Sequence, residues 1–147
     1  PYIKIIFRIF VIMKNPSKYI RAGIITTLAP LTVPVWNKRI PKNESTPTKY
    51  ILIINQDTQQ YERSKSCYEY SCTFTLDLCN ITTLGNDATV QVDDLEEEVR
   101  TAMDSLRVPN FVVKDMSYSS FDLDMDTGTN TINRRLITYT IWLNYVV

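Results

Sequence analysis

The segment from residue 68 to residue 78 alternates between apolar and polar side chains, and it constrains the fold more than any other feature. Its six apolar residues occupy every second position: Tyr68, Tyr70, Cys72, Phe74, Leu76 and Leu78. The positions between them carry hydroxyl or carboxyl groups. Because neighbouring side chains of a strand point to opposite faces, this period of two predicts a long strand with one apolar and one solvated face.

Two other segments have the spacing of helices. In the first, Asn15 suits an N-cap and Pro16 suits the first helical position, and apolar residues then recur every four positions at Ile20, Ile24 and Leu28. In the second, apolar residues three or four positions apart form one stripe: Val92, Leu95, Val99, Met103 and Leu106. Carboxylates between residues 93 and 98 crowd the first turns of this helix, where we expect the helix dipole to favour them.

The remaining apolar segments predict strands. Residues 33–36 form a short extended piece, and the continuous apolar run at 50–54 predicts a strand that is buried on both faces. Residues 111–121 and 131–147 predict two long strands, which the polar turn at 126–130 joins into a hairpin. This order of elements indicates an α+β fold, in which two helices pack on an antiparallel or mixed sheet with long β-hairpins.

The length of 147 residues suits one domain with a single core, and we place this domain at residues 14–147. Residues 1–13 are strongly apolar but include Lys4 and Arg8, and the run is too short to cross a bilayer. We expect this segment to be either a non-native extension upstream of a natural start at Met13 or a β-prone arm that pairs with a neighbour. In both cases we expect no membrane partner.

Few residues suit catalysis or metal binding. Histidine is absent, and the spacing of Cys67, Cys72 and Cys79 predicts free thiols. Residues 122–126 carry aspartate at alternate positions, like the start of a calcium loop, but Gly128 comes one position late and Asn133 stands where the closing glutamate belongs. We therefore expect a protein that is not an enzyme, with no catalytic residues, no bound metal and no cofactor.

Charge is unevenly distributed, although basic and acidic residues balance at 16 each. Residues 1–49 include nine basic residues and one acidic residue, whereas residues 50–133 include five basic and fifteen acidic ones. Three interpretations stay open: a merely solvated surface, nucleic-acid binding by the basic segment, or a ring in which basic and acidic patches of successive copies meet. For the ring, we predict these contact residues on and after the short extended piece: Trp36, Lys38, Arg39 and Lys42.

Five segments carry a resemblance to a known family. They are the opening helix at 19–28, Val33-Pro34-Val35-Trp36, Arg39-Ile40-Pro41, the strand Tyr50-Ile51-Leu52-Ile53 and the closing stretch at 134–143. In element order and in these residues, most of the chain from residue 17 onward resembles the small neck and tail-terminator (tail-completion) proteins of tailed bacteriophages. The resemblance implies a non-enzymatic α+β subunit of the virion that forms a ring of six, or alternatively twelve, copies at the neck or tail.

The resemblance also implies partners. Such a ring is assembled in the host cytoplasm, contacts portal, connector or tail-tube proteins, and lets DNA pass through its lumen without specific binding. Since carboxylates repel phosphates, we expect the helix start at 93–98 or the segment 115–126 to face this channel. The candidate channel residues are Asp93, Asp94, Glu96, Glu97, Asp122, Asp124 and Asp126.

The competing interpretation, from another class, is an α+β module that binds nucleic acid or a small ligand on its sheet face. A steep loss of DNA affinity with salt would favour this module, whereas a ring without DNA affinity would favour assembly.

Overall fold

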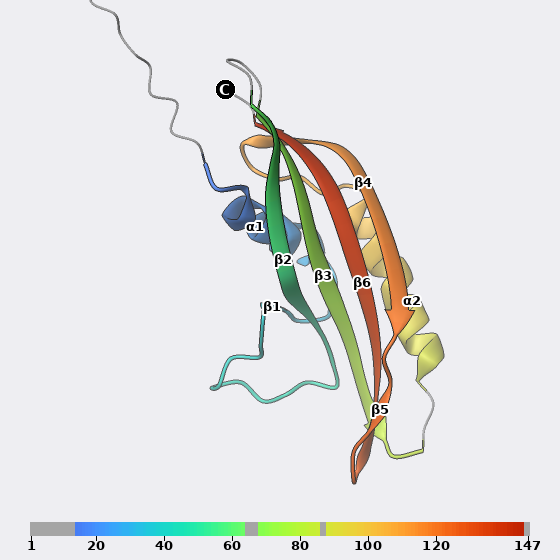
Figure 1. Ribbon diagram of the computed structural model, residues 1–147. Coiled ribbons are helices and arrows are strands. Elements are labelled where there is room, and N and C mark those ends of the chain that lie inside the picture. Colours follow the sequence, from blue (N-terminus) through green and yellow to red (C-terminus); the bar gives the residue numbers. More distant parts are fainter. Residues whose placement is uncertain (1–13, 64–67, 86–87, 146–147) are drawn as a thin grey trace, which may run out of the picture.

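The computed structural model describes residues 14–63, 68–85 and 88–145, and this part of the chain forms two helices and a six-stranded sheet (Figure 1). In chain order the elements are α1 (Pro16–Leu28), β1 (Val35–Asn37), β2 (Lys49–Arg63), β3 (Tyr68–Thr83), α2 (Thr89–Met103), β4 (Phe111–Asp122), β5 (Met125–Asp126) and β6 (Asn130–Tyr145). The sheet order is β1-β2-β3-β6-β4, with β5 paired to β6. Only the pairing of β1 with β2 is parallel among these neighbours, so the predicted α+β fold with a mixed sheet and long hairpins is confirmed.

Both helices pack on the same face of the sheet, behind the strands in Figure 1. The apolar alternation of β3 continues across β6 on this face, where Phe74 lies opposite Tyr139 and Leu76 lies opposite Ile137. The helices contribute their predicted stripes to the core: Ile20, Ile24 and Leu28 from α1, and Leu95, Val99 and Met103 from α2. Burial of this apolar surface is the main favourable contribution to folding.

Helix α1 begins as its sequence predicts. The side chain of Asn15 accepts a hydrogen bond from the backbone N–H of Ser17 at 3.0 Å, and Pro16 lies in the first turn. Gly23 is buried in the middle of the helix, where a Cβ atom would come within 2.5 Å of the carbonyl oxygen of Arg107. The missing side chain therefore lets α1 approach the loop that follows α2.

Strand β2 differs from its prediction in length and in burial. It runs over Lys49–Arg63, whereas the apolar run predicts only 50–54. The polar second half of the strand is extended because its backbone pairs with β3. The predicted burial on both faces is wrong. Ile51 and Ile53 are buried beneath the helices, but Leu52 on the opposite face is only half-buried.

The face of β3 that points away from the helices is less solvated than its alternation predicts. Thr75, Asp77 and Cys79 lie on this face, yet they are 5%, 3% and 2% exposed. Large side chains on the neighbouring strand flank them, since Tyr50 lies opposite Cys79 and Leu52 lies opposite Asp77. The prediction of a solvated face is therefore wrong over this part of β3.

Helix α2 begins at Thr89, so the carboxylates at 93–98 come after its first turn, which contains no acidic residue. The expected interaction of these carboxylates with the helix dipole is therefore wrong, since that effect falls off within the first turn. Leu106 lies beyond the last helical residue, Met103, but it is still buried in the core.

Two predictions, the arm at 1–13 and Cys67, concern residues outside the described part of the chain. Within the described part, neither helix combines the length and the apolar character that crossing a membrane requires.

Candidate assembly surfaces

The face of the sheet opposite to the helices carries a band of hydroxyl groups across β3, β6 and β4. The Oγ1 atoms of Thr73 and Thr140 are 3.5 Å apart, and those of Thr75 and Thr138 are 3.0 Å apart. In the register of β4 with β6, Ser119 lies opposite Thr138 and continues the second row. The centre of this face is therefore polar but uncharged.

One end of the same face is apolar. The strand registers place four large side chains in one row across the sheet, on either side of Asp77: Trp36, Leu52, Leu136 and Phe121. Phe121 is 56% exposed, and the ring of Trp36 lies 6.1 Å from the ring of Tyr50. Trp36 and Leu52 are half-buried and Leu136 is buried, so Phe121 is the exposed member of the row. Apolar groups on a sheet face that no described helix covers are typical of surfaces that association buries.

A buried ion pair crosses this apolar row. The carboxylate of Asp77 accepts hydrogen bonds from Nε of Arg134 at 3.1 Å and from Nη2 at 2.5 Å. The side chain of Asp77 is 4% exposed and that of Arg134 is 25% exposed. Hydrogen bonding to Asp77 raises the pKa of Arg134, although burial acts in the opposite direction. The pair thus keeps a carboxylate charged where water has little access.

Cys72 and Cys79 are buried free thiols, as their spacing predicts. Burial raises the pKa of the Cys72 thiol, and burial together with the charge of Asp77 raises the pKa of Cys79 to about 12. Burial likewise raises the pKa of the neighbouring Tyr50 hydroxyl to about 12. Because the thiolate is the nucleophile and the metal ligand, neither thiol is activated at neutral pH.

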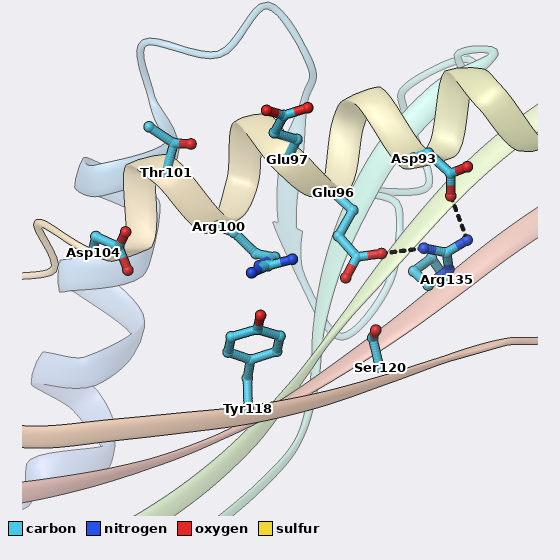
Figure 2. A pocket seen from close by; sticks show the side chains of 9 residues that line it. All are labelled: Asp93, Glu96, Glu97, Arg100, Thr101, Asp104, Tyr118, Ser120 and Arg135. Carbon is cyan, nitrogen blue, oxygen red and sulfur yellow. Dashed lines mark hydrogen bonds and ion pairs between the residues drawn. The ribbon is translucent and has the colours of Figure 1, made fainter.

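On the helix-covered face, Arg135 gathers three carboxylates from two elements. Its guanidinium pairs with Asp93 at 2.7 Å and with Glu96, both on α2 and both shown in Figure 2, and with Asp122 on β4. Burial lowers the pKa of Arg135, but the hydrogen bonds to these three carboxylates outweigh it, and the net direction is upward. The cluster ties α2 to the edge of the sheet.

Beside this cluster, a cavity of about 620 Å³ lies between α2 and the strands β4 and β6. We call it the acidic cavity, and its lining residues are Asp93, Glu96, Glu97, Arg100, Thr101, Asp104, Tyr118, Ser120 and Arg135. In Figure 2, Arg100 points from α2 toward the strands and Tyr118 points back toward it. The guanidinium of Arg100 lies 4.4 Å from the centroid of the Tyr118 ring, a cation–π contact. Carboxylates outnumber guanidinium groups in this lining, so the cavity favours a cation.

A buried hydroxyl group near Tyr118 has no hydrogen-bond partner among the described residues. Tyr139 is 1% exposed, and its hydroxyl makes no hydrogen bond within the described part of the chain. Its ring lies 5.8 Å from the ring of Tyr118, and burial raises its pKa while the charge of Arg100 lowers it. An unpaired buried hydroxyl costs about 1–3 kcal/mol, and Tyr139 is not among the residues that line the acidic cavity.

The predicted contact residues lie at the other edge of the sheet. Trp36 is half-buried in β1, and the loop that follows begins at Lys38, whose φ is 68° and whose backbone N–H donates to the carbonyl of Ile53 at 3.0 Å. Lys38, Arg39 and Lys42 are exposed, and none of them forms an ion pair within residues 14–63, 68–85 and 88–145.

The predicted channel carboxylates are divided among three places. Three of them meet at Arg135, as described above. Asp124 and Asp126 lie near the tip of the β4–β6 hairpin, where they accept hydrogen bonds from a backbone N–H and a hydroxyl group of β6 at 3.2 and 2.7 Å. Asp94 and Glu97 are exposed on α2. Among the described residues, no cluster of three or more acidic or cysteine side chains is placed to hold a metal ion.

Three residues that organise the acidic cavity were not predicted from the sequence: Arg135, Arg100 and Tyr118. A signal for Arg135 exists, because the alternation of Ile137 and Tyr139 extended back by one step puts it on the helix-covered face. An arginine on such a face needs a carboxylate partner. Its partners on α2, however, lie 39 and 42 residues away along the chain, and no local pattern identifies them.

Comparison with known proteins gives a structural likeness. No protein-family model and no curated protein matches the chain, whereas 27 chains of solved structures match it. One of these, from the virion of a native gene transfer agent particle, has 11% sequence identity and a TM-score of 0.64, over 90% of this chain and 99% of that chain. Another has 13% identity over 85% of this chain and 94% of that chain, with a TM-score of 0.48. The first of these matches shows that the chain shares its fold with a chain of a virion.

Proposed function

We propose that this chain is a structural, non-enzymatic virion protein of a tailed phage or a phage-like particle, which forms a ring at the neck or tail as a tail terminator or head–tail joining protein. The observation that carries the proposal is the fold shared with a virion chain of a gene transfer agent particle, which extends over 99% of that chain. The resemblance of five segments to neck and tail-terminator proteins supports the same assignment.

The sheet face that no described helix covers is consistent with a subunit of an assembly. Association stabilises a protein by burying exposed apolar surface, and the row that includes half-buried Leu52 and exposed Phe121 offers such surface. In the proposed ring, this face lies against another copy or against the portal, connector or tail-tube protein next in the particle.

We place the tip of the β4–β6 hairpin at the DNA channel. Asp124 and Asp126 are exposed there, and their charges would repel the phosphates of passing DNA. Glu96 does not belong to this surface, because it is 7% exposed and pairs with Arg135.

The proposal is tested on the purified chain by native mass spectrometry and by electron microscopy of the particles. We expect closed rings of six or twelve copies, and a chain that stays monomeric at every concentration would contradict the proposal. Titration of labelled duplex DNA at low and moderate salt provides the second measurement. Strong binding that weakens steeply with salt would favour a nucleic-acid-binding module instead.

A further inference from the structure

We infer that the basic loop of one copy docks at the acidic cavity of the next copy, so that the ring closes through one repeated contact. The basic loop is residues 38–42, with the cations Lys38, Arg39 and Lys42. The inference rests on the proposed assembly and names the two surfaces that carry it.

The two surfaces lie at opposite edges of the sheet. The basic loop follows β1 at one end of the order β1-β2-β3-β6-β4, and β4 and α2 lie toward the other end (Figure 1). The acidic cavity is lined by residues of α2, β4 and β6. Side-by-side copies in one orientation therefore bring the basic edge of each copy to the acidic edge of the next. Such a contact between two different surfaces is heterologous, and it gives a closed ring when its rotation closes.

Each surface carries exposed charges that form no ion pair with another described residue of the same copy. The cations of the basic loop form no ion pair within the described residues. On the other side, Glu97 and Asp104 line the acidic cavity, are exposed, and likewise form no ion pair in the described part of the chain. Opposite charges placed this way steer association and fix its register.

The interior of the acidic cavity is chemically suited to a guanidinium or ammonium group. One wall already holds the guanidinium of Arg100 against the ring of Tyr118, at 4.4 Å from its centroid. The carboxylates of Glu97 and Asp104 are exposed and line the same cavity. A long basic side chain is the group of this protein that complements these carboxylates.

Charge reversal on each surface tests the contact. The first variant is Lys38→Glu/Arg39→Glu, and the second is Glu97→Lys/Asp104→Lys. We expect each variant alone to need at least tenfold more protein than the wild type for half-maximal assembly in analytical ultracentrifugation. A matched control, Lys18→Glu/Arg107→Glu, reverses two exposed charges outside both surfaces and should assemble like the wild type.

An equimolar mixture of the two variants gives the decisive result. In the mixture, the reversed loop of one variant meets the reversed cavity of the other, and both kinds of contact regain opposite charges. We expect assembly to return to the wild-type concentration, with native mass spectra that show strictly equal numbers of the two variants in each particle. Thermal melts followed by circular dichroism check that each variant is folded.

The outcomes separate this contact from the proposed function. Wild-type rings, together with folded variants that assemble normally or a mixture that does not recover, would overturn the docking contact and leave the virion assignment standing. A wild-type chain that never assembles would overturn both. Recovery restricted to the mixture supports the contact, because a general loss of stability is not repaired by mixing.

Discussion

Asp77 lies on a sheet face that no described helix covers, and it is nevertheless almost inaccessible to water. Its carboxylate stays charged because Arg134 donates two hydrogen bonds to it from the neighbouring strand. The same short stretch of β3 buries Cys79, whose thiol is kept protonated. The side chains of Asp77 and Arg134 therefore hold each other in place. A substitution of either residue leaves the other without its ion-pair partner.

Asp77→Asn should lower the free energy of unfolding by about 2–4 kcal/mol, because removing one partner of a buried ion pair leaves the other charge uncompensated. Urea denaturation of the two proteins measures the difference. The control Asp115→Asn changes an exposed carboxylate of β4 and should stay within about 0.5 kcal/mol of the wild type. A loss no larger than that of the control would show that the pair contributes little.

The raised pKa values of Cys79 and Tyr50, both to about 12, predict a loss of stability in alkaline solution. A group whose pKa is raised in the folded state stabilises the fold fully at pH values below its unfolded-state pKa. This contribution disappears as the pH rises toward 12. Cys79→Ala removes one such group, so the decline in unfolding free energy between about pH 9 and 12 should become shallower by up to about 1.4 kcal/mol per pH unit. Denaturation curves at several alkaline pH values measure it, and identical slopes would refute the assignment to Cys79.

At the scale of secondary structure, local periodicity predicted the elements that pack on the core. The stripe of α1, with its cap at Asn15, and the alternation of β3 are properties of consecutive residues, so the sequence alone identified both. The second half of β2 has no apolar period, and its strand conformation depends on pairing with β3, which local patterns do not contain. For the same reason the half-burial of Leu52 was not predicted, since it depends on which face the helices cover.

Gly23→Ala tests how closely α1 approaches the rest of the molecule. The added Cβ would lie 2.5 Å from the carbonyl oxygen of Arg107, so the helix or the loop must shift. We expect a loss of about 1–3 kcal/mol in unfolding free energy, as for other overpacked sites. Gly128→Ala is the matched control, because no heavy atom lies within 4 Å of its added Cβ. Equal melting temperatures of the two variants would contradict the close approach.

At the scale of the whole molecule, the order of the strands separates in space the charges that are separated along the chain. The basic loop lies toward one edge of the sheet, and the acidic helix α2 lies toward the other (Figure 1). The sequence predicted contact residues at Lys38 and Arg39, and the family resemblance implied that carboxylates of α2 face a channel, which stays a prediction. The loop and α2 lie toward opposite edges because of the order of the strands in the sheet, β1-β2-β3-β6-β4. Composition and spacing do not reveal this order. The acidic cavity was missed because its walls come from three elements far apart in sequence.

Assembly through these edges predicts that thermal stability depends on protein concentration. Association favours only the folded state, so a hundredfold increase in concentration should stabilise each copy by about 2 kcal/mol and raise the melting temperature by about 5 °C. Scanning calorimetry of the wild type over this range measures the rise. The variant Lys38→Glu/Arg39→Glu should show almost none, and a concentration-independent wild type would argue against assembly.

The shift in pairing between Val113 and Asp115 gives β4, the strand at the end of the sheet order, one additional residue, Lys114. A kinked outer strand with a lysine on it is a poor template for another strand. Copies of this protein are thereby discouraged from adding to one another backbone to backbone without end, as amyloid fibres do. Copies then associate through side-chain contacts, and such contacts can give an assembly with a fixed number of subunits.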